Sequence, residues 1–238
     1  MKLFLIAAGC ILSVSLTAQS PVSKTYTVTA GQSVTLKFDY PIVRVSTWEK
    51  NEVSVTATVN INDHENDDAF TLSGINEAGG LVVSDEIKNM NKLPRRYTIV
   101  ENGKKSIYHT REEYENARKS GNHQRSYEGT DIDIVLEVKV PAQSPIDIKS
   151  VYGIVEMINF HAPVVVDATY GGIDATIATA NTGKLKATTS YGQIYSNLDL
   201  KITDHTERDF FNSITAEPGT GPSFSLTSTY GKIYLRKP

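Results

Sequence analysis

Two stretches near the end of the chain, LKATTSYGQIYS from Leu185 and FSLTSTYGKIYL from Phe224, repeat one pattern of twelve residues. Two further copies precede them, IDIKSVYGIVEM from Ile146 and VVVDATYGGIDA from Val164. When the copies are aligned on the tyrosine of Tyr-Gly, apolar residues recur at alternate positions on both sides of that pair. Alternation with a period of two predicts a β-strand before the pair and another after it.

The Tyr-Gly pair itself is predicted to be a bulge or a corner. The apolar positions lie at even distances before the tyrosine and at odd distances after it, and a continuous strand cannot make that change. Glycine suits a corner because it adopts positive φ without a Cβ clash, so we expect positive φ at Gly171 and Gly192. Residues 34–45 fit the same pattern with Pro41 in place of glycine, and this corner should bend differently, as a first or edge unit does.

The spacing of the copies predicts how they are arranged. Their tyrosines are separated by 18, 21 and 39 residues, and the longest interval contains a degraded copy, FNSITA, with Phe211 and Asn212 at the Tyr-Gly positions. Strand units that recur about every 20 residues without helices between them stack to bury a shared core. The sequence therefore predicts an all-β protein, a parallel β-solenoid with rungs of about 20 residues. The competing interpretation is a sandwich of hairpins, in which consecutive strands reverse direction.

The first 18 residues are predicted to be a cleaved signal peptide. Lys2 precedes an apolar run, and Ala18 precedes the polar segment QSPVSK. A membrane anchor, or a lipoprotein signal at Cys10, is the alternative. Cleavage would leave residues 19–238 as one β-solenoid domain without cysteine, with no membrane span, located in the periplasm, at the cell surface or outside the cell.

Residues 88–128 interrupt the repeats with a polar insertion. The insertion has ten Lys or Arg residues and five Glu residues, whereas the whole chain has a net charge of −3. Asn102 and Gly103 predict a hairpin, and Thr110 with Glu113 predicts the start of a helix of about ten residues that ends at Gly121. The insertion either is a solvated excursion that covers the open side or end of the solenoid, or forms a basic, tyrosine-bearing contact surface for an anionic partner. The candidate contact residues are Arg95, Arg96, Tyr97, Lys104, Lys105, Tyr108, Arg118 and Lys119.

No catalytic, metal or cofactor site is predicted. Glu156 and Asp174 occupy the same position in adjacent copies, but no further acid or base supports a glycosidase pair. The five histidines are scattered, and the acidic residues 62–68 lack the glycine and terminal glutamate of a calcium loop, so a solvated loop is expected there. The slightly acidic composition also argues against nucleic-acid binding. We therefore expect a protein that is not an enzyme.

The run LEVKVPAQSPIDIKSVYGIVEM, from Leu136 to Met157, and the Tyr-Gly repeats after it resemble an exported bacterial family of "putative adhesin" domains that is common in Bacteroidetes. The resemblance covers residues 25–87 and 129–238. It implies an exported β-solenoid and assigns no catalytic residue.

The sequence predicts an exported, adhesin-like, non-catalytic interaction protein with an envelope protein or a glycan as its partner. The alternative is a β-helix protein that binds or degrades polysaccharide. Tyr152, Tyr170 and Tyr191 are expected to stack on neighbouring rungs, as a structural ladder or as an outward apolar strip. Residues 236–238 are predicted to protect the edge of the last rung and keep the protein monomeric.

Overall fold

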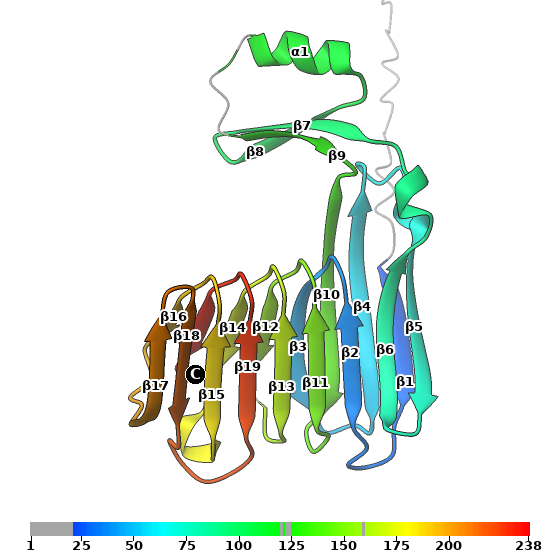
Figure 1. Cartoon of the computed structure of the whole chain (residues 1–238). Coiled ribbons are helices and arrows are strands. Elements are labelled where there is room, and N and C mark those ends of the chain that lie inside the picture. The colour runs from blue at the N-terminus through cyan, green and yellow to red at the C-terminus, as the bar shows by residue number, and fades with distance from the viewer. Residues whose placement is uncertain (1–20, 120, 122–124, 159) are drawn as a thin grey trace, which may run out of the picture.

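The computed structural model describes residues 21–119, 121, 125–158 and 160–238. The predicted signal peptide, residues 1–18, lies outside the described residues. Two large β-sheets face each other, and a three-stranded sheet with one α-helix extends from one end of them (Figure 1).

The first large sheet has eight strands. In spatial order they are β1 (Val22–Thr27), β4 (Glu52–Ile61), β10 (Ile132–Pro141), β3 (Ile42–Trp48), β12 (Val155–Ile158), β14 (Ile173–Thr176), β20 (Ile233–Arg236) and β16 (Ile194–Ser196).

The second large sheet has nine strands. In spatial order they are β17 (Ile202–Arg208), β18 (Phe211–Ala216), β15 (Leu185–Thr189), β19 (Phe224–Ser228), β13 (Val164–Ala168), β11 (Ile146–Ser150), β2 (Val34–Phe38), β6 (Gly80–Ile87) and β5 (Phe70–Glu77). Three short 3-10 helices lie in the connections, η1 (Asp67–Ala69), η2 (Met90–Lys92) and η3 (Thr179–Asn181).

Each Tyr-Gly or Tyr-Pro pair is a corner between these sheets, as the change of apolar spacing predicted. Each corner unit places its first strand in the nine-stranded sheet and its second in the eight-stranded sheet. The five corner units are β2–β3, β11–β12, β13–β14, β15–β16 and β19–β20, and their neighbouring strands pair in parallel.

The apolar columns of the repeat form the core. The side chains six and four positions before each tyrosine are at most 3% exposed in all four Tyr-Gly copies. Three and five positions after it, the residues are buried in every unit except β15–β16, where Ile194 is half-buried and Ser196 is exposed. Complete burial of one such Val, Leu or Ile stabilises the fold by about 1.5 to 3 kcal/mol, so the two sheets are held together by this repeated layer.

The all-β class is confirmed, but the sheets are mixed instead of wholly parallel. Antiparallel pairs lie at both ends, β1–β4, β4–β10 and β5–β6 at one and β15–β18 and β17–β18 at the other. The prediction that FNSITA is a degraded corner unit is wrong, since these residues form β18, which stays within one sheet.

The spatial order of the corner units also differs from the chain order. The last unit, β19–β20, lies between β13–β14 and β15–β16. The physical reason is that β18 occupies one edge of β15, which leaves the opposite edge for β19. Strand β20 thus pairs with β14 on one side and with β16 on the other, so residues 236–238 do not protect an unpaired edge. Instead, the Arg236 guanidinium donates two hydrogen bonds, of 2.6 and 2.8 Å, to the Asp174 carboxylate.

The expectation of positive φ at Gly171 and Gly192 is wrong as well. Positive φ occurs at other glycines, and the corner glycines are required for a different reason. Each corner glycine lies directly against a carbonyl oxygen of the neighbouring corner, so an added Cβ would collide with it. The distances from such a Cβ would be 1.5 Å for Gly153 to Pro41, 1.9 Å for Gly171 to Gly153, 2.1 Å for Gly231 to Gly171, and 2.0 Å for Gly192 to Gly231.

The insertion folds as predicted into a hairpin and a helix. Strands β7 (Arg96–Glu101) and β8 (Lys104–Tyr108) meet at Asn102 and Gly103, which have φ values of 50° and 75°. The third strand, β9 (Arg125–Gly129), pairs with β7. Helix α1 (Arg111–Lys119) begins with the capping box, in which Thr110 and Glu113 exchange hydrogen bonds of 3.2 and 3.3 Å.

Candidate functional site

The most distinctive surface feature is a continuous row of aromatic rings along the corners, which we call the aromatic row. It contains Tyr40, Tyr152, Tyr170, Tyr230, Tyr191 and Phe210, in that spatial order. The five tyrosines stack with centroids 4.9 to 5.2 Å apart and ring planes within 17° of each other. The predicted tyrosine stack is thus confirmed, with Tyr230 between Tyr170 and Tyr191.

The backbone of the corners fixes the spacing of the rings. The Tyr170 amide donates a 2.7 Å hydrogen bond to the Val151 carbonyl, and the Tyr230 amide donates a 2.9 Å bond to the Thr169 carbonyl. The buried hydroxyl of Ser228 donates to the Gly171 carbonyl at 2.8 Å. Main-chain bonds fix the backbone of these tyrosines, and stacking fixes their ring planes. The rings therefore lose little side-chain entropy when a partner binds them.

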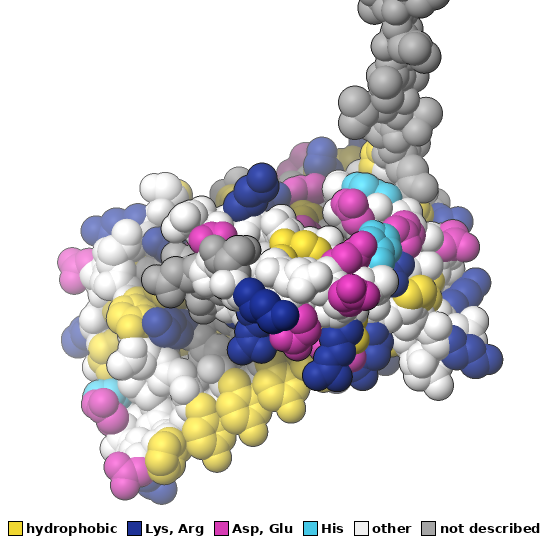
Figure 2. Space-filling view, turned by 90° about the horizontal axis from the view of Figure 1, so that it is seen from above, with side chains coloured by type: hydrophobic (Ala, Val, Ile, Leu, Met, Phe, Trp, Pro, Cys, Tyr) yellow, Lys and Arg dark blue, Asp and Glu magenta, His cyan; other side chains and the backbone are white. Residues whose placement is uncertain are grey.

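The row is solvent-exposed, and Figure 2 shows a diagonal line of hydrophobic side chains beside a group of charged side chains of both signs. The side chains of Tyr152, Tyr170, Tyr230 and Tyr191 are 48 to 57% exposed. Since each ring covers the face of the next, the row presents ring edges and hydroxyl groups at intervals of about 5 Å. The surface of the row therefore consists of regularly spaced tyrosine hydroxyl groups above apolar ring edges.

Phe210 ends the row and differs from the tyrosines in two respects. It is 72% exposed, and its ring is tilted by 38° against Tyr191. It also has a φ of 60° at the tip of the β17–β18 hairpin, where Gly or Asn is usual. The repeat pattern did not identify Phe210. Its one signal in the sequence is the apolar pair Phe210-Phe211 within a polar stretch.

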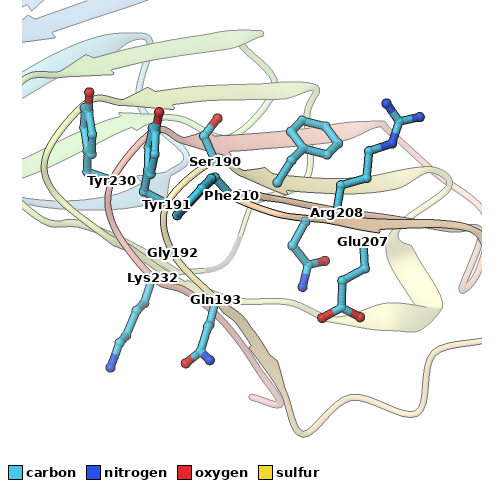
Figure 3. Close-up of a pocket in the computed structure, with 11 residues that line it drawn as sticks. Ser190, Tyr191, Gly192, Gln193, Glu207, Arg208, Phe210, Tyr230 and Lys232 are labelled. Carbon is cyan, nitrogen blue, oxygen red and sulfur yellow. The ribbon is translucent and has the colours of Figure 1, made fainter.

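A pocket of about 410 Å³ lies between the β17–β18 hairpin and the corners at Tyr191 and Tyr230 (Figure 3). Its aromatic wall comprises Tyr191, Tyr230, Phe210 and Phe211, and its polar lining includes Gln193, Glu207, Arg208, Asn212 and Lys232. Tyr191 and Tyr230 stand side by side with their hydroxyl groups pointing in the same direction. The buried Asn212 Oδ1 has no hydrogen-bond donor in the described part of the chain. The pocket thus combines apolar ring surface with groups that donate and accept hydrogen bonds.

Glu156 and Asp174 are neighbours on the outer face of the eight-stranded sheet, as their shared position predicted. Each is paired with an arginine. The Arg44 Nε donates to Glu156 Oε2 at 2.9 Å, and Arg236 binds Asp174 through both oxygens. Both carboxylates are therefore held in ion pairs with arginine.

The candidate residues of the basic insertion lie in different environments. Arg96 is buried and pairs with Glu65. Lys105 pairs with Asp131 at 2.6 Å, and Arg95 pairs with Glu128 at 3.2 Å.

The other candidates lie at or near the surface of the insertion. Tyr97 stacks on Tyr114 at 5.2 Å, and Tyr108 is half-buried. Lys104, Arg118 and Lys119 are exposed. Some of the eight candidate contact residues thus form ion pairs or ring contacts, and others face solvent.

The solvated loop expected at residues 62–68 is a turn that is solvated only in part, with Asp63, His64, Glu65 and Asp68 exposed. Its buried residues attach the insertion to the large sheets. Asn62 is fully buried, donates a 2.9 Å hydrogen bond to the Pro94 carbonyl, and accepts one of 3.0 Å from the Asp131 amide. Asp67 accepts a 2.7 Å bond from the Ile61 amide. Its hydrogen bond to His64 raises the pKa of that histidine.

Among the described residues, no three or more His, Cys, Asp or Glu side chains are placed together so that they could hold a metal ion. Helix α1, the sole α-helix in the described part of the chain, has 9 residues and is too short to span a bilayer.

No protein-family model matches the sequence, and no curated protein matches it. Among solved structures, the chain is similar to the crystal structure of "a putative cell adhesion protein" from Clostridium sporogenes. The identity is 8% and the TM-score 0.46, over 92% of this chain and 100% of the other. The resemblance of the repeats to the adhesin family stays an expectation.

Proposed function

We propose that this chain is an exported, adhesin-like, non-catalytic protein that holds a cell-envelope or extracellular partner along the aromatic row. Within this proposal the five parallel corner units form a short β-solenoid segment, and the antiparallel strands close its ends. The export follows from the signal-peptide pattern of residues 1–18.

The observation that supports this function best is the exposure of the row. A tyrosine whose only task is to stack at a corner gains from burial, yet four adjacent rings remain about half exposed. Tyrosine is enriched in protein interfaces because it offers a large rigid area with a polar tip at a small loss of side-chain entropy. The row provides this chemistry in a fixed and repeated form.

The exposed basic residues of the insertion supply the second part of the proposed contact surface. Three of them face solvent, Lys104, Arg118 and Lys119. They give this part of the surface a positive charge, although the whole chain has a net charge of −3. An anionic partner would be attracted to this side of the molecule, and that attraction weakens as salt screens it.

Adsorption of the purified protein to bacterial envelope fragments tests the proposal. The variant replaces Tyr152 and Tyr170 with Ala. The matched control replaces Tyr195 and Tyr234, a second stacked pair 5.2 Å apart that lies outside the row. We expect the row variant to lose about tenfold or more in affinity, equivalent to about 1.4 kcal/mol, while the control binds like the parent. Equal adsorption of the two variants would remove the row as the contact surface.

A further inference from the structure

We propose that the pocket at the Phe210 end of the aromatic row binds one sugar ring of a glycan chain, and that the tyrosine hydroxyl groups hold the units that follow. This inference rests on the proposed function of the row as a contact surface, and it names the class of partner.

Phe210 provides the ring face that sugar recognition requires. A pyranose ring has an apolar face of C–H groups, which packs on the flat face of an aromatic ring. The inner tyrosines cannot offer this surface, because their planes lie within 17° of their neighbours at a distance of about 5 Å. The tilt of 38° and the exposure of 72% leave the Phe210 ring accessible.

The conformation of Phe210 indicates that its ring has a role at the surface. A bulky residue with a φ of 60° is unusual, and glycine would occupy the same turn without a steric clash. An exposed phenylalanine also keeps apolar area in water. Both disadvantages are explained if the ring receives a ligand, since strained backbone is concentrated at binding sites.

The polar lining matches the hydroxyl groups of a sugar. Every sugar hydroxyl both donates and accepts a hydrogen bond, so its site needs groups of both kinds. Gln193 and Asn212 supply amides, and the Gln193 Oε1 also accepts a hydrogen bond from the Tyr195 hydroxyl. Glu207 supplies acceptors, and Arg208 and Lys232 supply donors.

The ligand is inferred to be a chain because the pocket continues into the row. Tyr191 and Tyr230 both line the pocket and belong to the row, and the next hydroxyl groups follow at intervals of about 5 Å. An extended peptide is a poorer match, since its side chains on one face repeat about every 6.8 Å. A glycan carries hydroxyl groups on every unit and places donors and acceptors along the whole row.

The pocket is suited to binding and not to hydrolysis of the chain. Glycosidases of the common type place two carboxyl groups on either side of the bond they cleave. Glu207 is the single carboxylate among the residues that line the described pocket. Its Oε2 lies 3.8 Å from His205 Nε2.

The test compares adsorption to envelope fragments before and after mild periodate oxidation, which cleaves the vicinal diols of sugars and leaves most protein intact. The variant is Phe210→Gly, which removes the ring and suits the left-handed turn, so it folds at least as well as the parent. Ile75→Ala is the control, because Ile75 is an exposed apolar residue on β5, at the opposite edge of the nine-stranded sheet from the pocket. We expect periodate to abolish adsorption, Phe210→Gly to weaken it about tenfold or more, and Ile75→Ala to leave it unchanged.

A gel that contains soluble β-glucan or galactomannan gives a second measurement, and retardation of the parent but not of Phe210→Gly supports the glycan assignment. Adsorption that survives periodate, or that Phe210→Gly does not change, overturns it. If adsorption is periodate-resistant but still depends on Tyr152 and Tyr170, the proposed function stands and its partner is a protein. If adsorption is independent of the row, the proposed function fails as well.

Discussion

Replacement of Gly171 by alanine should be among the most destabilising small changes in this protein. An alanine Cβ at this position would lie 1.9 Å from the Gly153 carbonyl oxygen and 2.5 Å from its carbon. Both atoms belong to the backbone of the adjacent corner, so no side-chain rotation relieves the overlap. The two corners would have to separate by roughly 1 Å before the carbon and oxygen reach a tolerable distance.

The size of the effect follows from the bonds that such a separation breaks. The Tyr170 amide and the Val151 carbonyl are 2.7 Å apart, and the Thr169 amide and the Ser150 carbonyl are 2.9 Å apart. Loss of these two hydrogen bonds costs about 2 kcal/mol, and loss of the Tyr152–Tyr170 ring stack costs about 0.5 to 1.5 kcal/mol more. With the residual strain of overpacking, the total is on the order of 3 to 5 kcal/mol. That total corresponds to a fall in Tm of roughly 10 °C for a chain of this size.

Urea denaturation followed by circular dichroism measures this change, and two other glycines separate its causes. At Gly79 an added Cβ has no heavy atom within 4 Å and φ is not in the left-handed region, so Gly79→Ala should be neutral or slightly stabilising. At Gly103 the space is also open but φ is +75°, so Gly103→Ala should cost about 1 kcal/mol through backbone conformation alone. A Gly171→Ala variant no less stable than Gly103→Ala would refute the reasoning, because it would show that the corners are not held at this distance.

Four further outcomes are expected. Burial raises the pKa of Asp85 to about 6, above its ordinary value of 3.8. The stability gained from its protonated form is complete below pH about 4 and is lost as the pH rises through about 6. In urea denaturation at pH 8, Asp85→Asn should therefore stabilise the fold by about 2 to 3 kcal/mol and reduce the pH dependence between these values. Deletion of residues 236–238 removes the ion pair with Asp174, so differential scanning calorimetry should show a lower Tm, while light scattering shows no new self-association. A variant that lacks residues 90–126 should still have the far-ultraviolet circular dichroism spectrum of a folded β-protein, because the insertion shares no strand with the two large sheets. Loss of that spectrum would show that the insertion is a structural cap. Phe210→Gly should raise the free energy of unfolding by about 1 kcal/mol through release of the left-handed turn, and an equally stable variant would argue against strain there.

The sequence alone determined the local features of this protein. The period-two alternation located the strands of every Tyr-Gly unit, and the shift of apolar spacing located the corners, because side-chain direction in a strand depends only on position along the chain. The Asn102-Gly103 hairpin and the Thr110–Glu113 capping box were predicted for the same reason, since each is formed by residues close in sequence.

The tertiary structure decided how the units are placed beside one another. Because all corner units carry the same apolar columns, the sequence could not show that β19–β20 lies between two earlier units, and only the antiparallel docking of β18 on β15 resolves that order. The role of the corner glycines was hidden for a related reason, since it depends on a carbonyl oxygen of another corner and not on the glycine's own φ. The aromatic row follows from the same long-range pairing, which brings Phe210 against Tyr191 across the end of the stack and forms the pocket there.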